Sequence, residues 1–138
     1  MALRSRLEGP DVADVADVAI VAVFIRSKLY SGVSVARRVS LSRWDEMSLE
    51  RINEMVSRKV IAGARQTLAQ FLLKRGALIA RHAHAGEQIT YVLDGALRYG
   101  VDGEDVVVRA GDVLVIPAGA KHQVTVLEDS LVISSFSL

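Results

Sequence analysis

Three histidines are the residues of this chain with the clearest capacity for chemistry. His82 and His84 are two residues apart, and His122 follows a Pro-Ala-Gly turn later in the chain. The 138 residues contain no other histidine and no cysteine. Neutral imidazoles bind divalent transition metals, whereas the lack of thiols excludes thiolate metal sites and a disulfide framework. The histidines therefore predict a metal site, provided that the fold brings them together.

Strand geometry would place the histidine pair on one face. Alternate residues of a β-strand point to the same side, so His82 and His84 project together if they lie on a strand. A tight turn at Ala85-Gly86 follows, and Gln88 would then begin a return strand opposite the pair. His122 lies near the start of a later strand, which a closed barrel could bring to the same place. This spacing favours a site inside a β-barrel.

From residue 57 onward, the sequence reads as a series of short strands. Apolar runs occupy residues 57–63, 66–73, 77–84, 88–93, 96–101, 105–110, 112–117, 122–127 and 131–136. Turn formers separate the runs and no helical pattern intervenes, which is typical of an antiparallel sandwich or barrel. Asp94-Gly95 and Asp102-Gly103 match preferred hairpin turns, and Glu128-Asp129 separates the last two runs. Lipocalin-like and OB-like barrels also fit this pattern.

The first forty residues differ from the rest. We divide the chain into an N-terminal extension, residues 1–40, and a barrel domain, residues 41–138. The apolar run 12–25 is interrupted by two aspartates and falls short of the roughly 20 residues of a membrane-spanning helix. An amphipathic helix over about 11–29, or a strand covering a barrel edge, would bury this run. A short helix or turn is expected within 42–55.

The charge balance argues against nucleic-acid and membrane partners. Seventeen basic and sixteen acidic residues leave a net charge of +1, and the basic residues are scattered. Such a balance creates no long-range field that would attract nucleic acid or an anionic membrane. The aspartates in the N-terminal apolar run also spoil a secretory signal. We therefore expect a cytoplasmic protein.

Two stretches of the chain resemble the paired motifs of the cupin family. The first carries Gly76, His82, His84, Gln88 and Gly95, and the second carries Gly111, Pro117, Gly119 and His122. Glutamine stands where the family usually has glutamate, and Val126 stands where it often has asparagine. The chain is similar to small single-domain cupins. The resemblance implies an all-β double-stranded β-helix, a jelly-roll barrel, with a metal inside its mouth and a short helical or extended segment before it.

The resemblance also implies a set of metal ligands. Transferred position by position, they are His82, His84, Gln88 and His122, holding one divalent transition metal per chain, either Mn, Fe, Ni, Zn or Cu. Glu87 precedes Gln88 and should face the opposite way, because alternate strand residues point to opposite faces. Three imidazoles and an amide leave the cation's charge uncompensated. A small anionic organic molecule is therefore the expected partner.

Cupins that linearise unsaturated uronates resemble the chain more closely, through the run EQITYVLDG. In that group the last strand carries Asp-x-Phe and an arginine four residues beyond the phenylalanine. Here Phe136 matches, Ser134 replaces the acid, and the arginine would fall beyond Leu138. The proton-transfer and carboxylate-binding groups of that reaction are thus missing. Phe136 and Gln70 are our candidates for substrate contact, and no catalytic residue is assigned.

Three functions follow from these features. The first is a metal-dependent enzyme acting on a small organic acid, as an isomerase, a lyase or a dioxygenase, with the metal as Lewis acid. The second is a non-catalytic cupin that binds or senses a small molecule. The third is a structural barrel with an empty or adventitious metal site. Small cupins commonly pair by sharing N-terminal strands, so we also expect a homodimer.

Overall fold

The structure is a computed structural model that describes residues 39–137. The predicted helix or strand over about 11–29 lies outside the described residues. The elements are a 3-10 helix, η1 (Trp44–Glu46), and the strands β1 (Glu50–Arg51), β2 (Val56–Ala62), β3 (Gln66–Leu73), β4 (Leu78–His82), β5 (Gln88–Val101), β6 (Glu104–Arg109), β7 (Val113–Ile116) and β8 (His122–Ser137). Within the described residues, no helix is long and apolar enough to cross a membrane.

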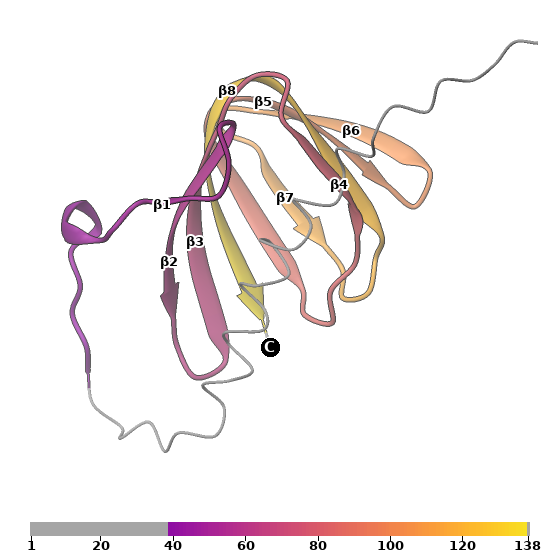
Figure 1. The fold of residues 1–138 in the computed structure, drawn as a ribbon. Helices are drawn as coiled ribbons and strands as arrows, with labels where there is room; N and C mark the ends of the chain where they lie inside the picture. The colour runs from indigo at the N-terminus through magenta and orange to yellow at the C-terminus, as the bar shows by residue number, and fades with distance from the viewer. Residues whose placement is uncertain (1–38, 138) are drawn as a thin grey trace, which may run out of the picture.

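All strand pairs are antiparallel and belong to one sheet that curls around an interior (Figure 1). The strand order is β1-β2-β3-β8-β5-β6, with β4 paired to β8 and β7 paired to β5. The two long strands, β5 and β8, pair with each other along most of their length. Each also pairs with two shorter strands, one after the other. This is the predicted all-β double-stranded β-helix.

Strict alternation of side chains builds the interior. In β3 the buried residues are Thr67, Ala69, Phe71 and Leu73, and their neighbours face outward or are half-buried. The same period of two buries Gln88, Thr90 and Val92 on β5, and Val124 and Val126 follow His122 on β8. Strand alternation thus directs Gln88 and His122 toward the same interior. Apolar residues of strands β2 to β8 complete the core, together with Ala77 from the loop before β4.

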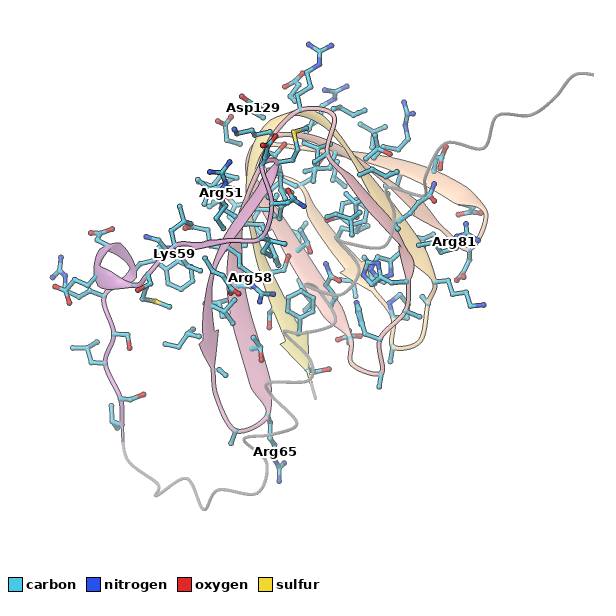
Figure 2. All side chains as sticks on the ribbon, in the orientation of Figure 1. Arg51, Arg58, Lys59, Arg65, Arg81 and Asp129 are labelled. Atoms are coloured by element: carbon cyan, nitrogen blue, oxygen red, sulfur yellow. The ribbon has the colours of Figure 1, made fainter. Side chains whose placement is uncertain are left out.

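Arg58, on β2, is a charged side chain that faces the otherwise largely apolar interior. Only 3% of Arg58 is exposed, and its Nε donates to Glu50 Oε2 on the edge strand β1 at 2.9 Å. Figure 2 shows the contrast with Arg65, at the tip of the β2–β3 hairpin, and Asp129, at the opposite end of the sheet. The short helix expected within 42–55 is confined to η1, because β1 pairs with β2 instead.

The predicted hairpin at Asp94-Gly95 is wrong. Strand β5 continues through both residues, and its pairing with β8 shifts register around them. Gly95 has a φ of +93°, and a Cβ there would collide with the Asp129 carbonyl and Ser130. The glycine therefore serves a bulge against β8, and the predicted break at Glu128-Asp129 lies within β8. A left-handed glycine after an aspartate suits both a hairpin turn and a bulge, so the partner strand decides between them.

The second hairpin prediction is confirmed. Asp102 and Gly103 have φ values of 47° and 84° and join β5 to β6. Val101 pairs with Glu104 directly across the turn. Two consecutive positive φ values are what a tight type I′ turn requires, and Asp-Gly provides them at low cost.

Candidate metal centre

The fold brings the three histidines together. His82 is the last residue of β4 and lies directly across from His122, the first residue of β8. His84 follows two residues after β4, and its ring centroid is 5.0 Å from that of His122. One nitrogen from each ring lies within 4.8 Å of the other two. The cluster could therefore hold one metal ion.

Backbone carbonyls orient all three rings in the same way. The Nδ1 atoms of His82, His84 and His122 lie 2.8, 2.7 and 2.9 Å from the carbonyl oxygens of Ala80, Gly86 and Ala120. A carbonyl oxygen only accepts, so each Nδ1 carries the proton in these contacts. In a neutral imidazole this leaves the lone pair on Nε2. The backbone thus prepares three Nε2 lone pairs, the form in which histidine binds metals.

Burial keeps His122 neutral. Desolvation lowers the pKa of His122 from 6.5 to about 4, against an opposing contribution from the Ala120 carbonyl, and the nearby His82 and His84 lower it further. Only 1% of the residue is exposed. An imidazole with this pKa is unprotonated at neutral pH. It is therefore available as a metal ligand without first losing a proton.

Gln88 lies against the histidine cluster and offers a fourth candidate ligand atom. Its Oε1 is 3.0 Å from His84 Nε2, while its Nε2 donates to Thr90 Oγ1 at 2.8 Å. His84 already donates through Nδ1, so two acceptor atoms face each other unless the ring carries a second proton or the Gln88 amide is turned over. Ligand atoms about 2.1 Å from one cation, at right angles, are about 3 Å apart. The pair therefore fits the geometry of two ligands sharing one cation.

Glu87 lies outside the cluster. Its side chain is exposed, and its backbone exchanges hydrogen bonds with Ser137, whose Oγ and N are 2.9 and 3.0 Å from the Glu87 N and O atoms. Gln88 is 6% exposed and faces inward. The alternation expected for these two neighbours is the one observed.

The loops that carry the ligands are tied to each other. Gly119 N donates to the carbonyl of His84 at 2.8 Å, which links the two motifs found in the sequence. A Cβ on Gly86 would lie 1.8 Å from the Ser137 carbonyl oxygen, so a side chain there would force the last strand away. Gly86 also supplies the carbonyl that faces His84 Nδ1. The glycine thus permits the close approach that orients this ring.

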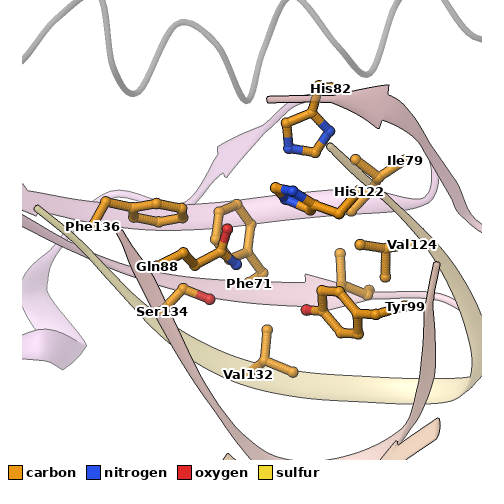
Figure 3. Close-up of a pocket in the computed structure, with 11 residues that line it drawn as sticks. Phe71, Ile79, His82, Gln88, Tyr99, His122, Val124, Val132, Ser134 and Phe136 are labelled. Atoms are coloured by element: carbon orange, nitrogen blue, oxygen red, sulfur yellow. The ribbon is translucent and has the colours of Figure 1, made fainter. Parts of the chain in front are cut away.

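A cavity of about 30 Å³ adjoins the cluster (Figure 3). It is lined by Phe71, Leu73, Ile79, His82, Gln88, Tyr99, His122, Val124, Val132, Ser134 and Phe136. Phe136, a predicted substrate contact, is among them and packs edge-on against His84 with ring centroids 5.8 Å apart. Gln70 is not: it is half-buried on the other face of β3, and Phe71 takes the inward position. The cavity wall is mostly apolar and carries no carboxylate or basic side chain among the described residues other than histidine.

Three hydroxyl residues behind Gln88 received little weight from the sequence. Thr90, Ser134 and Tyr99 are 0%, 2% and 3% exposed. Strand alternation from Gln88 and Phe136 would have placed Thr90 and Ser134 inside, and that was the available signal. The hydrogen bond between Thr90 and Ser134 joins β5 to β8, so it depends on strand pairing and the sequence did not reveal it.

The sequence and the fold are both similar to known cupins. The family described as the cupin domain matches residues 69–133. The structure of KdgF from a Halomonas species is 31% identical, with a TM-score of 0.67, over 72% of this chain and 94% of that one. An RmlC-like cupin from Shewanella frigidimarina has the same TM-score at 25% identity, over 72% of this chain and 91% of that one.

A shorter similarity connects the chain with an enzyme. Acireductone dioxygenase of Rhodopseudomonas palustris is 49% identical over 45 residues, which are 30% of this chain and 27% of the dioxygenase. The chain therefore matches only about a quarter of the length of that relative.

Proposed function

Because the chain belongs to the cupin family, we propose that it is a metal-dependent enzyme acting on a small organic acid. The contact between His84 Nε2 and Gln88 Oε1, 3.0 Å apart, carries this proposal. A cation between them would satisfy both acceptors. His82, His84, Gln88 and His122 would hold one divalent ion, either Mn, Fe, Ni, Zn or Cu. Such an ion supplies Lewis-acid or oxygen-activating chemistry when bound.

The charge of the site supports an anionic substrate. The four proposed ligands are neutral, and the described residues that line the cavity include no carboxylate. A buried divalent charge without compensation is costly, so an anionic oxygen of the substrate would stabilise it. Phe71 and Phe136 would exclude water and contact the apolar part of the substrate.

The cavity favours oxygen-dependent chemistry over isomerisation or elimination. Those two reactions need a protein group that moves a proton, and the cavity wall offers no Asp, Glu, Lys or Arg among the described residues. Ser134 occupies the position of the acid in the uronate-linearising group. The similarity to part of an acireductone dioxygenase supports the same choice. We therefore favour a dioxygenase over an isomerase or lyase.

A non-catalytic binding protein is the second candidate. The cavity of about 30 Å³ would hold little beyond an ion and one or two waters. Its few polar groups are sufficient to hold a small anion but provide little for general acid or base catalysis. A sensor that binds a metal and a small acid needs nothing more.

Oxygen uptake tests the two candidates directly. The purified protein, loaded with each metal in turn, is supplied with acireductones, catechols and short carboxylic acids. Metal-dependent oxygen consumption would support the dioxygenase. An anaerobic change in ultraviolet absorbance would instead indicate an isomerase or lyase. Saturable acid binding without turnover would indicate a binding protein.

Metal analysis of a double variant tests the site itself. His82→Ala combined with His122→Ala should lose the bound metal, whereas Gln123→Ala, on the exposed side of β8, should keep it. Equal metal content in the double variant and the wild type would show that the ion binds elsewhere.

A homodimer and a cytoplasmic location remain proposals from the sequence. Exposed apolar residues on the outer side of the sheet, among them Ile89, Tyr91 and Val113, support the homodimer. The near balance of charges supports the expectation that neither nucleic acid nor a membrane is a partner.

A further inference from the structure

The two ends of β8 meet at the ring of His84. The ring centroid of His84 is 5.0 Å from that of His122, the first residue of β8, and 5.8 Å from that of Phe136, near the end of the strand. A straight strand would span about 46 Å between these two positions. Figure 1 shows how β8 instead arches over the barrel and returns. The end of β8 therefore lies beside the metal centre, although it carries no proposed ligand.

Ser137, the last residue of β8, is bonded to the loop between His84 and Gln88. Its Oγ accepts from Glu87 N at 2.9 Å, and its backbone N donates to the Glu87 carbonyl at 3.0 Å. On its other side Ser137 pairs with Gln66 of β3, so the sheet holds it in place. The two bonds to Glu87 therefore fix the loop against a firm support, one residue before a proposed ligand.

Gly86 connects this support to the His84 ring. The Gly86 carbonyl oxygen lies 2.7 Å from His84 Nδ1. Gly86 also approaches the end of β8 so closely that an added Cβ would lie 1.8 Å from the Ser137 carbonyl oxygen. The carbonyl that orients the ring is thus held against Ser137. A shift of this loop would turn the ring and move its Nε2 from its place 3.0 Å from Gln88 Oε1.

The other two histidines are positioned differently. His82 and His122 lie on β4 and β8 and pair with each other directly, so the strand ladder places both backbones. His84 lies beyond the end of β4, in the loop before β5. Its ring is therefore the one whose direction depends most on contacts that the loop makes with the rest of the barrel.

We propose that Ser137 is a positioning residue of the metal centre, which holds the Gly86 carbonyl in place and thereby directs His84 Nε2 toward the ion. The inference rests on the proposed function, because it concerns the same metal centre. Ser137 acts through the loop and is not itself a ligand. Its hydroxyl supplies one of the two bonds that fix the loop, so removing the hydroxyl should weaken metal binding without abolishing it.

Co²⁺ is the probe, titrated into the metal-free full chain and followed by its visible absorption. Ser137→Ala removes the acceptor for Glu87 N but keeps the backbone bond. Its Co²⁺ affinity should fall about fivefold, as for one lost hydrogen bond. Ser137→Thr retains the hydroxyl and should restore the affinity. Ser135→Ala makes the same substitution on the other face of β8 and should stay within about twofold of the wild type.

A double-mutant cycle with His84→Ala separates positioning from a general effect on the fold. Three proposed ligands remain in His84→Ala, so Co²⁺ binding can still be measured. If Ser137 acts through the His84 ring, adding Ser137→Ala to this variant should change its affinity by less than about twofold, because the two residues are coupled. Thermal unfolding of each metal-free variant shows that it is folded.

Gly86→Ala tests the same contact from the loop side. The added Cβ would force the loop away from Ser137, so Co²⁺ affinity should fall about 10- to 100-fold, the usual effect of losing the outer partner of a metal-binding histidine. Gly63→Ala is the control, because a Cβ there would make only an ordinary contact, 3.5 Å from the Gln66 carbonyl oxygen. Its affinity should equal that of the wild type.

Each failure has a distinct meaning. Wild-type Co²⁺ affinity in folded Ser137→Ala would overturn the role of Ser137. A fivefold loss that persisted in the His84→Ala background would overturn it as well, because Ser137 would then act on the fold and not on the ring. Either result would leave the proposed function standing. If the wild type bound no Co²⁺, or if His82→Ala with His122→Ala bound it equally well, the proposed function would fail together with this inference.

Discussion

The two faces of β5 reverse the usual distribution of polar and apolar residues. Toward the interior, the first half of the strand directs Gln88 and Thr90, which are 6% and 0% exposed. Toward solvent it directs Ile89, Tyr91 and Leu93, which are 37–43% exposed. Burying a polar group costs free energy unless it has a hydrogen-bond partner. Contiguous apolar surface exposed to water is typical of a site that binds another molecule. The inner face therefore carries hydrogen-bonded polar groups, and the outer face presents apolar surface to solvent.

The outer face extends across four strands. We call it the outer apolar face, and its residues are Leu68 and Leu72 on β3, Leu131 and Ile133 on β8, Ile89, Tyr91 and Leu93 on β5, and Val113 and Val115 on β7. Tyr91 pairs with Ile133 on one side and Val113 on the other, so the surface is continuous. None of these residues carries a charge, so two copies meeting here would bring no like charges together.

Removing a metal ligand from the inner face should have the largest effect. His122→Ala should weaken metal binding by about a hundred- to a thousandfold, since a structural zinc site of four ligands is worth about 10–16 kcal/mol in total, or about 2.5–4 kcal/mol for each ligand. The neighbouring Gln123→Ala changes the opposite face of β8 and should leave the affinity unchanged. Competition with a chelator of known affinity measures both. Equal metal affinities in His122→Ala and Gln123→Ala would contradict a metal site on the inner face of β8.

The stability of the metal-free protein should depend on pH through the inner face. The pKa of His122 is about 4 in the folded protein against 6.5 unfolded, so the unfolded chain binds more protons between these values. Stability is therefore fully present above about pH 6.5 and falls as the pH approaches 4, by up to about 3 kcal/mol. Denaturant unfolding at several pH values measures the loss, and His122→Asn should flatten the curve. A wild-type stability that did not change over this range would contradict the burial of a neutral histidine.

Reciprocal substitutions at Glu87 and Gln88 should distinguish the two faces of β5 by charge. Gln88→Glu places a carboxylate beside the proposed cation, so metal affinity should rise and acetate affinity of the loaded protein should fall about tenfold. Glu87→Gln changes the same strand by the reverse substitution but on the outer side, and should alter neither. Calorimetric titration gives both constants. An unchanged acetate affinity in Gln88→Glu would argue against the under-neutralised cation.

The outer apolar face should govern self-association with little effect on metal binding. Tyr91→Lys and Ile133→Lys would place a charge in the centre of the face and should convert a dimer into a monomer. Sedimentation velocity at micromolar concentration measures the change, with Val106→Lys on β6 as an exposed apolar control. A monomeric wild type would contradict the homodimer, and dimeric lysine variants would place its interface elsewhere.

Local patterning predicted most of the strands. It also predicted that the three histidines would come together. Alternation along β5 also predicted that Gln88, and not Glu87, faces inward. These predictions succeeded because alternation is a property of the strand itself. Gln70 was a sequence-based candidate for substrate contact, but Phe71 takes the inward position of β3 and Gln70 lies on the other face.

Sequence alone determined the residue types of the site and the order in which the strands carry them. Tertiary structure decided what those residues could do together. The bulge at Gly95, the contact between His84 and Gln88, and the hydrogen bond between Thr90 and Ser134 all depend on how β5 meets β8 and the loops beside it. A local pattern specifies which way a side chain points, but hydrogen-bond partners far apart in the chain are specified only when the strands pair.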